Sequence, residues 1–318
     1  MNSTSGDVMK KVVIVGELLI DMISEEYVDD LSEARVFRRY FAGSPGNLAV
    51  NLKSLNIEPV LLASVGNDSF GKGYLRWLKE KNIDTSFIRI ADQPTSIVII
   101  SKSKDTPQFI PIRGADYLLE LPEDPDSLFM KVAFLHLTSW PLSMKPARET
   151  AKILLKMAAK KDVKICLDPN FRELLWEKGH DGRAFLKEIM KSVYLAKPSL
   201  DDSFHIFGKG SPERYVELFH SYGVENVVLT LGAEGVLISN GRTSMHIPAF
   251  AKNVVDTTGA GDAFWSGLYY GLLQGFDVFD AAKLGNAAAA FRIEHEDKSV
   301  PLPEFSQLKI IAEMGMTS

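Results

Sequence analysis

The sequence predicts a doubly wound α/β fold, in which a mostly parallel sheet is flanked by helices and carries a small β lid. Short apolar runs alternate with amphipathic segments along the 318 residues, as in strands connected by helices. The runs are nearly continuous in Val, Ile and Leu, which is typical of strands buried on both faces of a parallel sheet. Two polar stretches interrupt this alternation, and we interpret them as the lid.

The individual elements follow from these runs in chain order. Buried strands are predicted at residues 12–16, 60–65, 132–137, 163–168, 193–197 and 226–231. Amphipathic helices are expected between them, at residues 48–55, 71–81, 148–161 and 213–222. Two helices rich in small residues follow, at 263–274 and 278–293.

The lid is predicted from residues 23–41 and 94–116, where such a fold usually has compact connections. The second stretch has two apolar segments around a charged turn, which is the pattern of a hairpin. The core would then comprise residues 10–22, 42–93 and 117–310, and residues 1–9 would form a disordered N-terminus. Ordinary surface hairpins are the alternative interpretation of both stretches.

Composition and charge exclude several classes of partner and site. The 36 Lys and Arg against 41 Asp and Glu leave a net charge of −5, which offers no attraction to nucleic acid or to an anionic membrane. No run approaches the roughly 18 apolar residues of a membrane span, and no signal peptide is recognisable. The single cysteine, Cys166, and His136 both lie in apolar runs and are expected in the core. We therefore expect a soluble, cytoplasmic protein.

The most informative segment is the glycine-rich turn before the helix expected at residues 263–274. Gly259 and Gly261 allow backbone angles and close approaches that side chains would prevent. The first N–H groups of a helix lack intrahelical partners, and they lie at the positive end of the helix dipole. The turn therefore predicts a site for an anion, and especially for phosphate.

Asp262 lies in the same turn, where a carboxylate would repel a phosphate. Phosphoryl transfer to an alcohol nevertheless requires a base that accepts the hydroxyl proton beside groups that stabilise the transferring phosphoryl. The combination predicts a phosphotransferase with Asp262 as its base. A favourable charge on the helix dipole is the alternative explanation for this residue.

Residues 256–264, Asp-Thr-Thr-Gly-Ala-Gly-Asp-Ala-Phe, resemble the C-terminal signature of the PfkB (ribokinase-like) carbohydrate kinases. Residues 41–49 are similar to the glycine-rich N-terminal signature of that family. Further matches occur in family order at Gly16-Glu17 with Asp21, at Gly66-Asn67-Asp68 with Gly71, and at Asp168-Pro169-Asn170 with Arg172. The resemblance covers nearly the whole chain, and it implies a ribokinase-like fold and a sugar kinase.

The resemblance also implies a role for each matching residue. Asp262 would be the catalytic base, beside an anion hole for the γ-phosphate formed by the N–H groups of Gly259, Ala260 and Gly261. The residues that would hold the sugar are Asp21, Gly43, Asn47 and Arg113. Those that would line the nucleotide site are Thr230, Gly232, Gly235, Asn286 and Arg172. Asp256 and the carbonyl of Thr258 match part of the family's monovalent-cation site, which would bind K⁺.

One motif departs from the family pattern. The family's Asn-x-x-Glu motif organises Mg²⁺ and its waters, and Ser199 and Asp202 occupy its two positions here. Serine lacks the amide, and aspartate carries the charge on a shorter side chain. Asp202 would therefore act on Mg²⁺ through water, while ATP phosphates supply direct ligands. A non-catalytic sugar-binding protein with the kinase fold is the alternative in a different class.

Two other nucleotide-binding motifs are nearly matched. Residues 66–73 approach a P-loop, but Gly73 stands where Ser or Thr must bind Mg²⁺. The segment at 259–261 begins a dinucleotide-binding fingerprint, but Phe264 replaces its third small residue. We expect neither motif to function.

The predicted reaction transfers the γ-phosphoryl of ATP, with Mg²⁺, to a primary hydroxyl of a small sugar. Gly16-Glu17 and residues 113–116 are more similar to fructokinases than to ribokinases, so fructose is the first expectation. 2-Keto-3-deoxygluconate and ribose are the alternatives. Lid strands in this family often pair into dimers, so the lid is also a candidate homodimer interface.

Overall fold

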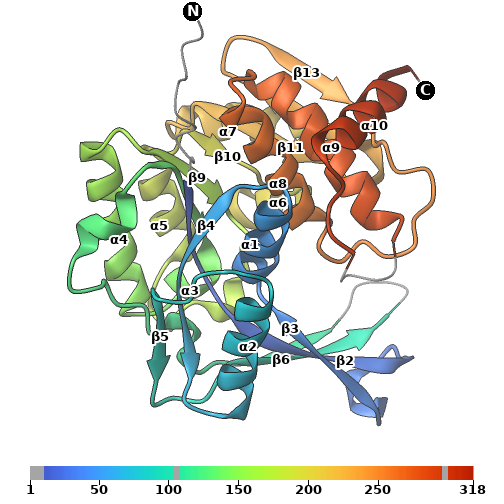
Figure 1. The fold of residues 1–318 in the computed structure, drawn as a ribbon. Helices are drawn as coiled ribbons and strands as arrows, with labels where there is room; N and C mark the ends of the chain where they lie inside the picture. Colours follow the sequence, from blue (N-terminus) through green and yellow to red (C-terminus); the bar gives the residue numbers. More distant parts are fainter. Residues whose placement is uncertain (1–10, 104–107, 296–299, 318) are drawn as a thin grey trace, which may run out of the picture.

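A computed structural model describes residues 11–103, 108–295 and 300–317. Nine strands form the main sheet, in the order β13-β12-β11-β10-β9-β8-β1-β4-β5 (Figure 1). Their bounds are β1 Lys11–Val15, β4 Glu58–Gly66, β5 Ile88–Ala91, β8 Val132–Thr138, β9 Lys164–Asp168, β10 Leu195–Ala196, β11 Asn226–Thr230, β12 Val236–Ser239 and β13 Ser244–Ile247. Each neighbouring pair of strands from β5 to β11 is parallel. Strand β12 pairs antiparallel with β11, and β13 pairs antiparallel with β12. The predicted mostly parallel sheet is thus confirmed.

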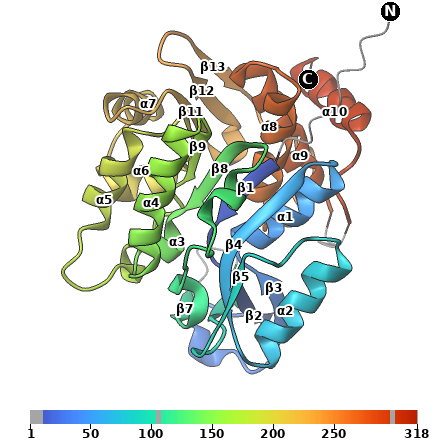
Figure 2. The ribbon, with the colours of Figure 1, turned by 60° about the vertical axis from the view of Figure 1, so that its left-hand side comes forward.

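Helices cover both faces of this sheet, as Figure 2 shows. One face packs against α1 Ser44–Ser54, α2 Ser69–Glu80, α8 Ala260–Leu273, α9 Val278–Ile293 and α10 Phe305–Thr317. The other packs against α4 Ala147–Lys160, α5 Gly182–Met190, α6 Leu200–Phe207 and α7 Pro212–Ser221. Along β1, Val12 and Ile14 join the first core cluster, whereas Val13 and Val15 join the second. This alternation explains why both faces of the strand are apolar.

Four strands form a second sheet, in the order β3-β2-β6-β7. Their bounds are β2 Leu19–Tyr27, β3 Phe37–Ala42, β6 Ile97–Lys102 and β7 Phe109–Ile112. The predicted hairpin is confirmed, because β6 and β7 pair antiparallel. The sheet begins at Leu19 rather than at residue 23, since β2 is a nine-residue strand that starts soon after β1. Residues 104 and 105 of the charged turn predicted at 102–105 lie outside the described residues, and so does the N-terminus predicted at 1–9.

The six strands predicted in the core are all present, close to their predicted bounds. Helix α1 starts at Ser44 rather than at residue 48, because Pro45 suits the first turn of a helix. The pattern did not predict β5, β12, β13, α5, α6 or α10. The remaining short elements are the helix α3 Ser139–Leu142 and 3₁₀ turns at Leu31–Glu33, Ala115–Tyr117, Pro125–Phe129, Glu173–Leu175 and Gly232–Glu234. None of the helices in the described ranges is long and apolar enough to cross a membrane.

The strand order reverses beside β1. The chain passes from β1 to β4 and β5 on one side, and then to β8 on the other. In open α/β sheets, ligands bind in the crevice beyond the carboxyl ends of the strands at such a point. Glu17 follows β1 and Thr138 ends β8, and Thr138 Oγ1 donates a hydrogen bond of 2.7 Å to Glu17 Oε2. This crevice is therefore the expected place for a substrate.

Candidate active site

The glycine-rich turn enters α8 as the sequence predicts. Gly259 is the N-cap of α8 with φ +77°, a left-handed conformation that favours glycine. A Cβ atom on Gly259 would meet nothing within 4 Å, so the backbone angle rather than packing requires glycine there. The N–H of Ala260 donates to the carbonyl of Thr257 at 3.2 Å. Gly261 lies on the exposed side of the turn, at the positive end of the helix dipole.

Asp262 occupies the first turn of α8 and is only 9% exposed. Its Oδ1 accepts a hydrogen bond of 2.6 Å from Ser44 Oγ, and its Oδ2 accepts one of 2.9 Å from Asn47 Nδ2. Burial raises the pKa of Asp262 to about 6, although these two hydrogen bonds lower it. A carboxylate with this pKa is suited to accept a proton near neutral pH.

The first turn of α1 lies against Asp262. Gly43, the N-cap of α1, has φ +99°, and a Cβ atom on it would lie 2.3 Å from the carbonyl oxygen of Glu17. Asn47 reaches Asp262 from the same turn. The structure thus brings the predicted sugar residues Gly43 and Asn47 to the predicted base, at the end of β1.

Asp21 lies on β2 of the second sheet, where it pairs with Tyr40 and Val98. Leu19 and Val98 share its face, and both belong to a small core cluster with Trp140, which follows β8. This placement puts Asp21 on the face of the second sheet that packs toward Trp140 at the end of β8. Burial raises the pKa of Asp21 to about 7.

Arg113 is held within the protein. Its guanidinium lies 2.6 Å from Asp116 Oδ2 and donates to Ser143 Oγ and to the carbonyl of Trp140. Asp116 is fully buried and accepts a further hydrogen bond from Ser96. The charge of Arg113 is therefore neutralised by Asp116, so Arg113 would attract a negatively charged substrate only weakly.

A buried lysine that the sequence analysis did not single out lies beside the glycine-rich turn. Lys197 follows β10 and is 5% exposed. Its Nζ lies 3.4 Å from Asp168 Oδ2 and 3.6 Å from where a Cβ atom on Gly261 would be. The sequence signal was its position, since a lysine at the carboxyl end of a buried parallel strand is unusual.

Most of the predicted nucleotide residues come from the C-terminal part of the chain. Thr230 ends β11, and Gly232 and Gly235 form the turn into β12, with φ +61° and +95°. A Cβ atom on Gly235 would lie 2.1 Å from the carbonyl oxygen of Ile247, so packing also requires this glycine. On α9, Asn286 donates to the carbonyl of Pro248 at 2.7 Å. These residues lie around the antiparallel edge of the main sheet, far along the chain from the sugar residues.

The altered magnesium motif forms a helix cap. Ser199 and Asp202 make a capping box at the start of α6, in which Asp202 Oδ2 accepts from both the N–H and the hydroxyl of Ser199. The other oxygen, Oδ1, accepts from the N–H of Phe171 at 2.7 Å and lies 3.6 Å from Arg172. Burial raises the pKa of Asp202. Both oxygens of this carboxylate are thus used within the protein.

The predicted monovalent-cation residues lie in the loop before α8. Asp256 Oδ1 accepts a hydrogen bond of 2.8 Å from the N–H of Thr258, and Thr258 is exposed. The carbonyl of Thr258 is close to the glycine-rich turn along the chain, as the prediction requires.

The comparisons with known proteins identify the family of this chain. A family model described as pfkB family carbohydrate kinase matches residues 9–304. The chain belongs to this family. It is therefore a carbohydrate kinase, and its two-sheet architecture is the ribokinase-like fold.

Relatives of this PfkB kinase differ in the names they carry. An ATP-dependent 6-phosphofructokinase of Thermoanaerobacterium thermosaccharolyticum is 42% identical over 95% of the chain and 94% of the relative. The solved fructokinase of Halothermothrix orenii is 40% identical, with a TM-score of 0.80 over 90% of this chain and 99% of that one. A Vibrio cholerae fructokinase, solved with fructose, ADP and calcium, is 25% identical with a TM-score of 0.83, over 96% and 100% of the two chains.

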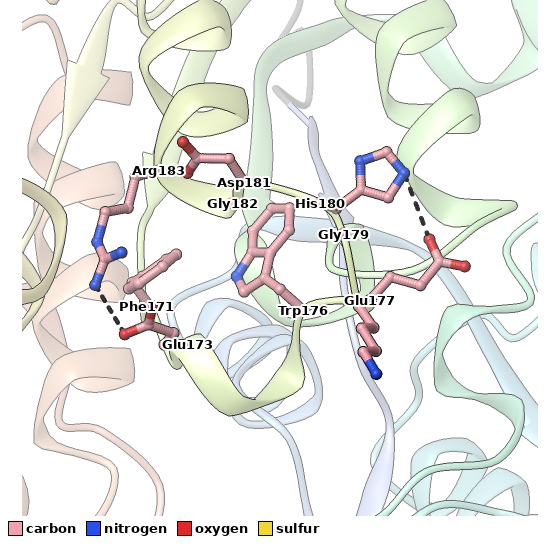
Figure 3. Close-up of a pocket in the computed structure, with 10 residues that line it drawn as sticks. Phe171, Glu173, Trp176, Glu177, Gly179, His180, Asp181, Gly182 and Arg183 are labelled. Carbon is pink, nitrogen blue, oxygen red and sulfur yellow. Dashed lines mark hydrogen bonds and ion pairs between the residues drawn. The ribbon is translucent and has the colours of Figure 1, made fainter.

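Figure 3 shows a different pocket of this kinase, lined by ten residues between Phe171 and Arg183. Its charged side chains pair with one another: Arg183 lies 2.8 Å from Glu173, and His180 lies 3.8 Å from Glu177. Trp176 packs between the rings of its neighbours in this region. None of the predicted site residues lines this pocket, so it is not the predicted site.

Two core predictions are confirmed. Cys166 is fully buried, and burial raises the pKa of its thiol to about 12, so it is not a nucleophile. His136 is fully buried as well, with Nδ1 2.8 Å from the hydroxyl of Tyr269. Burial lowers the pKa of His136 to about 4, so its ring is neutral.

Proposed function

We propose that this kinase transfers the γ-phosphoryl of ATP to a primary hydroxyl of fructose. The observation that carries the proposal is the Asp262 carboxylate, which is buried in the first turn of α8 and held by Ser44 and Asn47 at the start of α1. With a pKa of about 6, Asp262 is largely ionised at pH 7 and accepts the proton of the attacking hydroxyl. The N–H groups of Gly259, Ala260 and Gly261 receive the transferring phosphoryl at the positive end of the helix dipole, for which the Ala260 N–H would exchange its bond to the Thr257 carbonyl.

Lys197 completes the proposed phosphate site. It is the buried cation beside Gly261, and its ion pair with Asp168 fixes its position. A cation there would stabilise the charge that develops on the phosphoryl oxygens. Thr230, Gly232, Gly235, Asn286 and Arg172 remain the proposed nucleotide residues.

An uncharged sugar suits the crevice better than a phosphorylated one. Asp21 is an acid on the sugar side, and Arg113, the nearest predicted sugar-binding cation, is neutralised by Asp116. The fructokinase names of two solved relatives support fructose. Fructose 6-phosphate is the second candidate, because the 42% identical relative is named a 6-phosphofructokinase.

Mg²⁺ fits this site mainly as a complex with ATP. The described residues hold no group of three or more His, Cys, Asp or Glu side chains that could bind a metal ion. Mg²⁺ in kinases keeps several waters and binds substrate phosphates, so it needs few protein ligands. Asp202 would contact it through water, because its carboxylate is buried and already accepts hydrogen bonds from Phe171 and Ser199. When bound, the ion would neutralise phosphate charge. Asp256 and the Thr258 carbonyl would hold K⁺ nearby.

The second sheet is proposed as a lid over the sugar. Its β2 strand carries Asp21 on the face that packs toward Trp140 at the end of β8, so closure would exclude water from the reacting groups. On its other face, Ile110 and Ile112 are about half exposed. An apolar lid face of this kind supports the proposed homodimer.

The test is a turnover panel with ATP and fructose, fructose 6-phosphate, 2-keto-3-deoxygluconate or ribose. We expect the highest kcat/KM with fructose and, in Asp262→Asn, a loss of at least about 10²-fold in kcat. Lys72→Ala, at an exposed position of α2, is the control and should keep normal turnover. A preference for fructose 6-phosphate would establish the second candidate. Sugar binding without turnover under varied Mg²⁺ and K⁺ would point to the non-catalytic class.

A further inference from the structure

Both oxygens of the Asp262 carboxylate are held by one segment, the first turn of α1. Ser44 Oγ donates to Oδ1 at 2.6 Å, and Asn47 Nδ2 donates to Oδ2 at 2.9 Å. Each carboxylate oxygen has two acceptor positions, so both oxygens keep one free for a substrate hydroxyl. The two donors therefore fix the orientation of the carboxylate plane and leave one acceptor position on each oxygen open.

Ser44 is in turn held by Glu17, which follows β1. The N–H of Ser44 donates to Glu17 Oε1 at 3.3 Å, and Glu17 Oε2 accepts from Thr138 at 2.7 Å. Glu17 is 2% exposed, so this link is shielded from water. A continuous set of hydrogen bonds thus runs from the end of β8, through Glu17 and Ser44, to Asp262.

The hydroxyl of Ser44 has no role in capping its own helix. The N-cap of α1 is Gly43, and no side chain caps that end. Ser44 is the first residue of α1, and its Oγ points to Asp262 on α8 instead. A serine that served only the helix start would bond to the N–H groups of its own first turn.

Several groups face the Asp262 carboxylate from the surrounding elements. Burial and the charge of Asp168 on β9 raise the pKa of Asp262, whereas Ser44, Asn47 and Lys197 lower it. Tyr74 on α2 is fully buried, and its pKa lies well above its ordinary value, so its phenol is neutral. Ser44 and Asn47 thus favour the ionised carboxylate against the effect of burial.

We propose that Ser44 is a positioning residue, which orients the Asp262 carboxylate and keeps it ionised for proton transfer. The proposal rests on the assignment of Asp262 as base under the proposed function. Ser44 acts through Asp262 and does not need to touch the sugar. Asn47 is a less suitable test position, because it donates to the proposed base and is itself a proposed sugar ligand.

The experiment compares the pH dependence of kcat in the wild type, Ser44→Ala and Ser44→Thr, with saturating ATP and the best sugar of the panel. In Ser44→Ala we expect the acid limb of kcat to move up by about one pH unit, because one hydrogen bond to the carboxylate is lost. The one-unit shift alone should lower kcat at pH 7 about twofold, and the lost orientation of the carboxylate should bring the total loss to about tenfold. Only the twofold part should recover at about pH 8.5, while the sugar KM stays within about twofold. Ser44→Thr keeps the hydroxyl and should restore the wild-type limb.

Ser69→Ala is the matched control, because Ser69 is the first residue of α2 and is exposed. It should leave the pH profile unchanged. An acid limb in Ser44→Ala that coincides with that of the wild type would overturn the proposal, even if kcat fell at every pH. Turnover that survives in Asp262→Asn would instead refute the base assignment, so the two failures are distinguishable. Thermal unfolding of each variant identifies any loss of kcat that comes from misfolding.

Discussion

Trp265 Nε1 donates a hydrogen bond of 2.7 Å to Asp168 Oδ2, and this bond joins α8 to the carboxyl end of β9. The same carboxylate oxygen lies 3.4 Å from Lys197 Nζ. Trp265 is fully buried, and Asp168 and Lys197 are nearly so. The helix that carries the proposed base is thus connected to the buried cation beside its own first turn.

Trp265→Phe should weaken this connection while keeping an aromatic ring in the core. A buried carboxylate that loses one donor is less well fixed, and so is its lysine partner. We expect kcat to fall about tenfold and the sugar KM to change little. Tyr270→Phe removes a hydroxyl from a half-buried position on the same helix and serves as the control. Steady-state kinetics in which both variants behave alike would contradict this role for Trp265.

The kcat of the wild-type enzyme should fall on the acid side with a midpoint near pH 6. Burial raises the pKa of Asp262 to about 6, and only the ionised carboxylate can accept the hydroxyl proton. Below that pH the base is protonated, and each further pH unit should lower kcat about tenfold. The measurement is kcat from about pH 5 to about pH 9 with sugar and MgATP saturating. A flat profile on the acid side of neutrality would show that another group accepts the proton.

Asp21→Asn should raise the sugar KM by about tenfold or more, because a charged acceptor for sugar hydroxyls becomes neutral. The pKa of Asp21 is raised to about 7, so the wild-type KM should itself fall as the pH rises through 7. The variant should lose this dependence. Asp29→Asn, at an exposed position after β2, is the matched control. Asp21 would not be a sugar ligand if KM values for the two variants agreed.

Glu17→Gln should change how stability depends on pH. Burial raises the pKa of Glu17 from its ordinary value of 4.5 to about 8, so the folded state binds the proton more tightly than the unfolded state. The free energy of unfolding of the wild type therefore loses a contribution as the pH rises from 4.5 through 8. A glutamine side chain is always neutral, so the variant lacks this loss.

We expect the stability of Glu17→Gln relative to the wild type to increase by about 3–4 kcal/mol between about pH 5 and about pH 8. Urea unfolding at the two pH values measures the difference. Because the two proteins differ at this one position, the contributions of the other titratable groups cancel in the comparison. A difference that stays constant with pH would show that Glu17 is ionised in the folded protein.

The sequence by itself determined the parallel sheet and the place of the proposed base. Apolar runs buried on both faces predict such strands, and a glycine-rich turn before a helix predicts an anion site, because both depend on neighbouring residues only. Asp262 could be proposed as the base for the same reason, since phosphoryl transfer to an alcohol requires a base beside the phosphate site. The hairpin of β6 and β7 was predictable from its alternating segments and charged turn.

Only the tertiary structure decided which side chains meet. Ser44 and Asp262 are 218 positions apart, and Trp265 and Asp168 are 97 apart. The ion pair between Arg113 and Asp116, and the capping box that Asp202 forms at the start of α6, likewise could be recognised only from the fold. The order of the strands in the sheet brings these segments to one edge. Local sequence patterns carry no information about that order, so a side chain's final partner depends on the packing of the whole core.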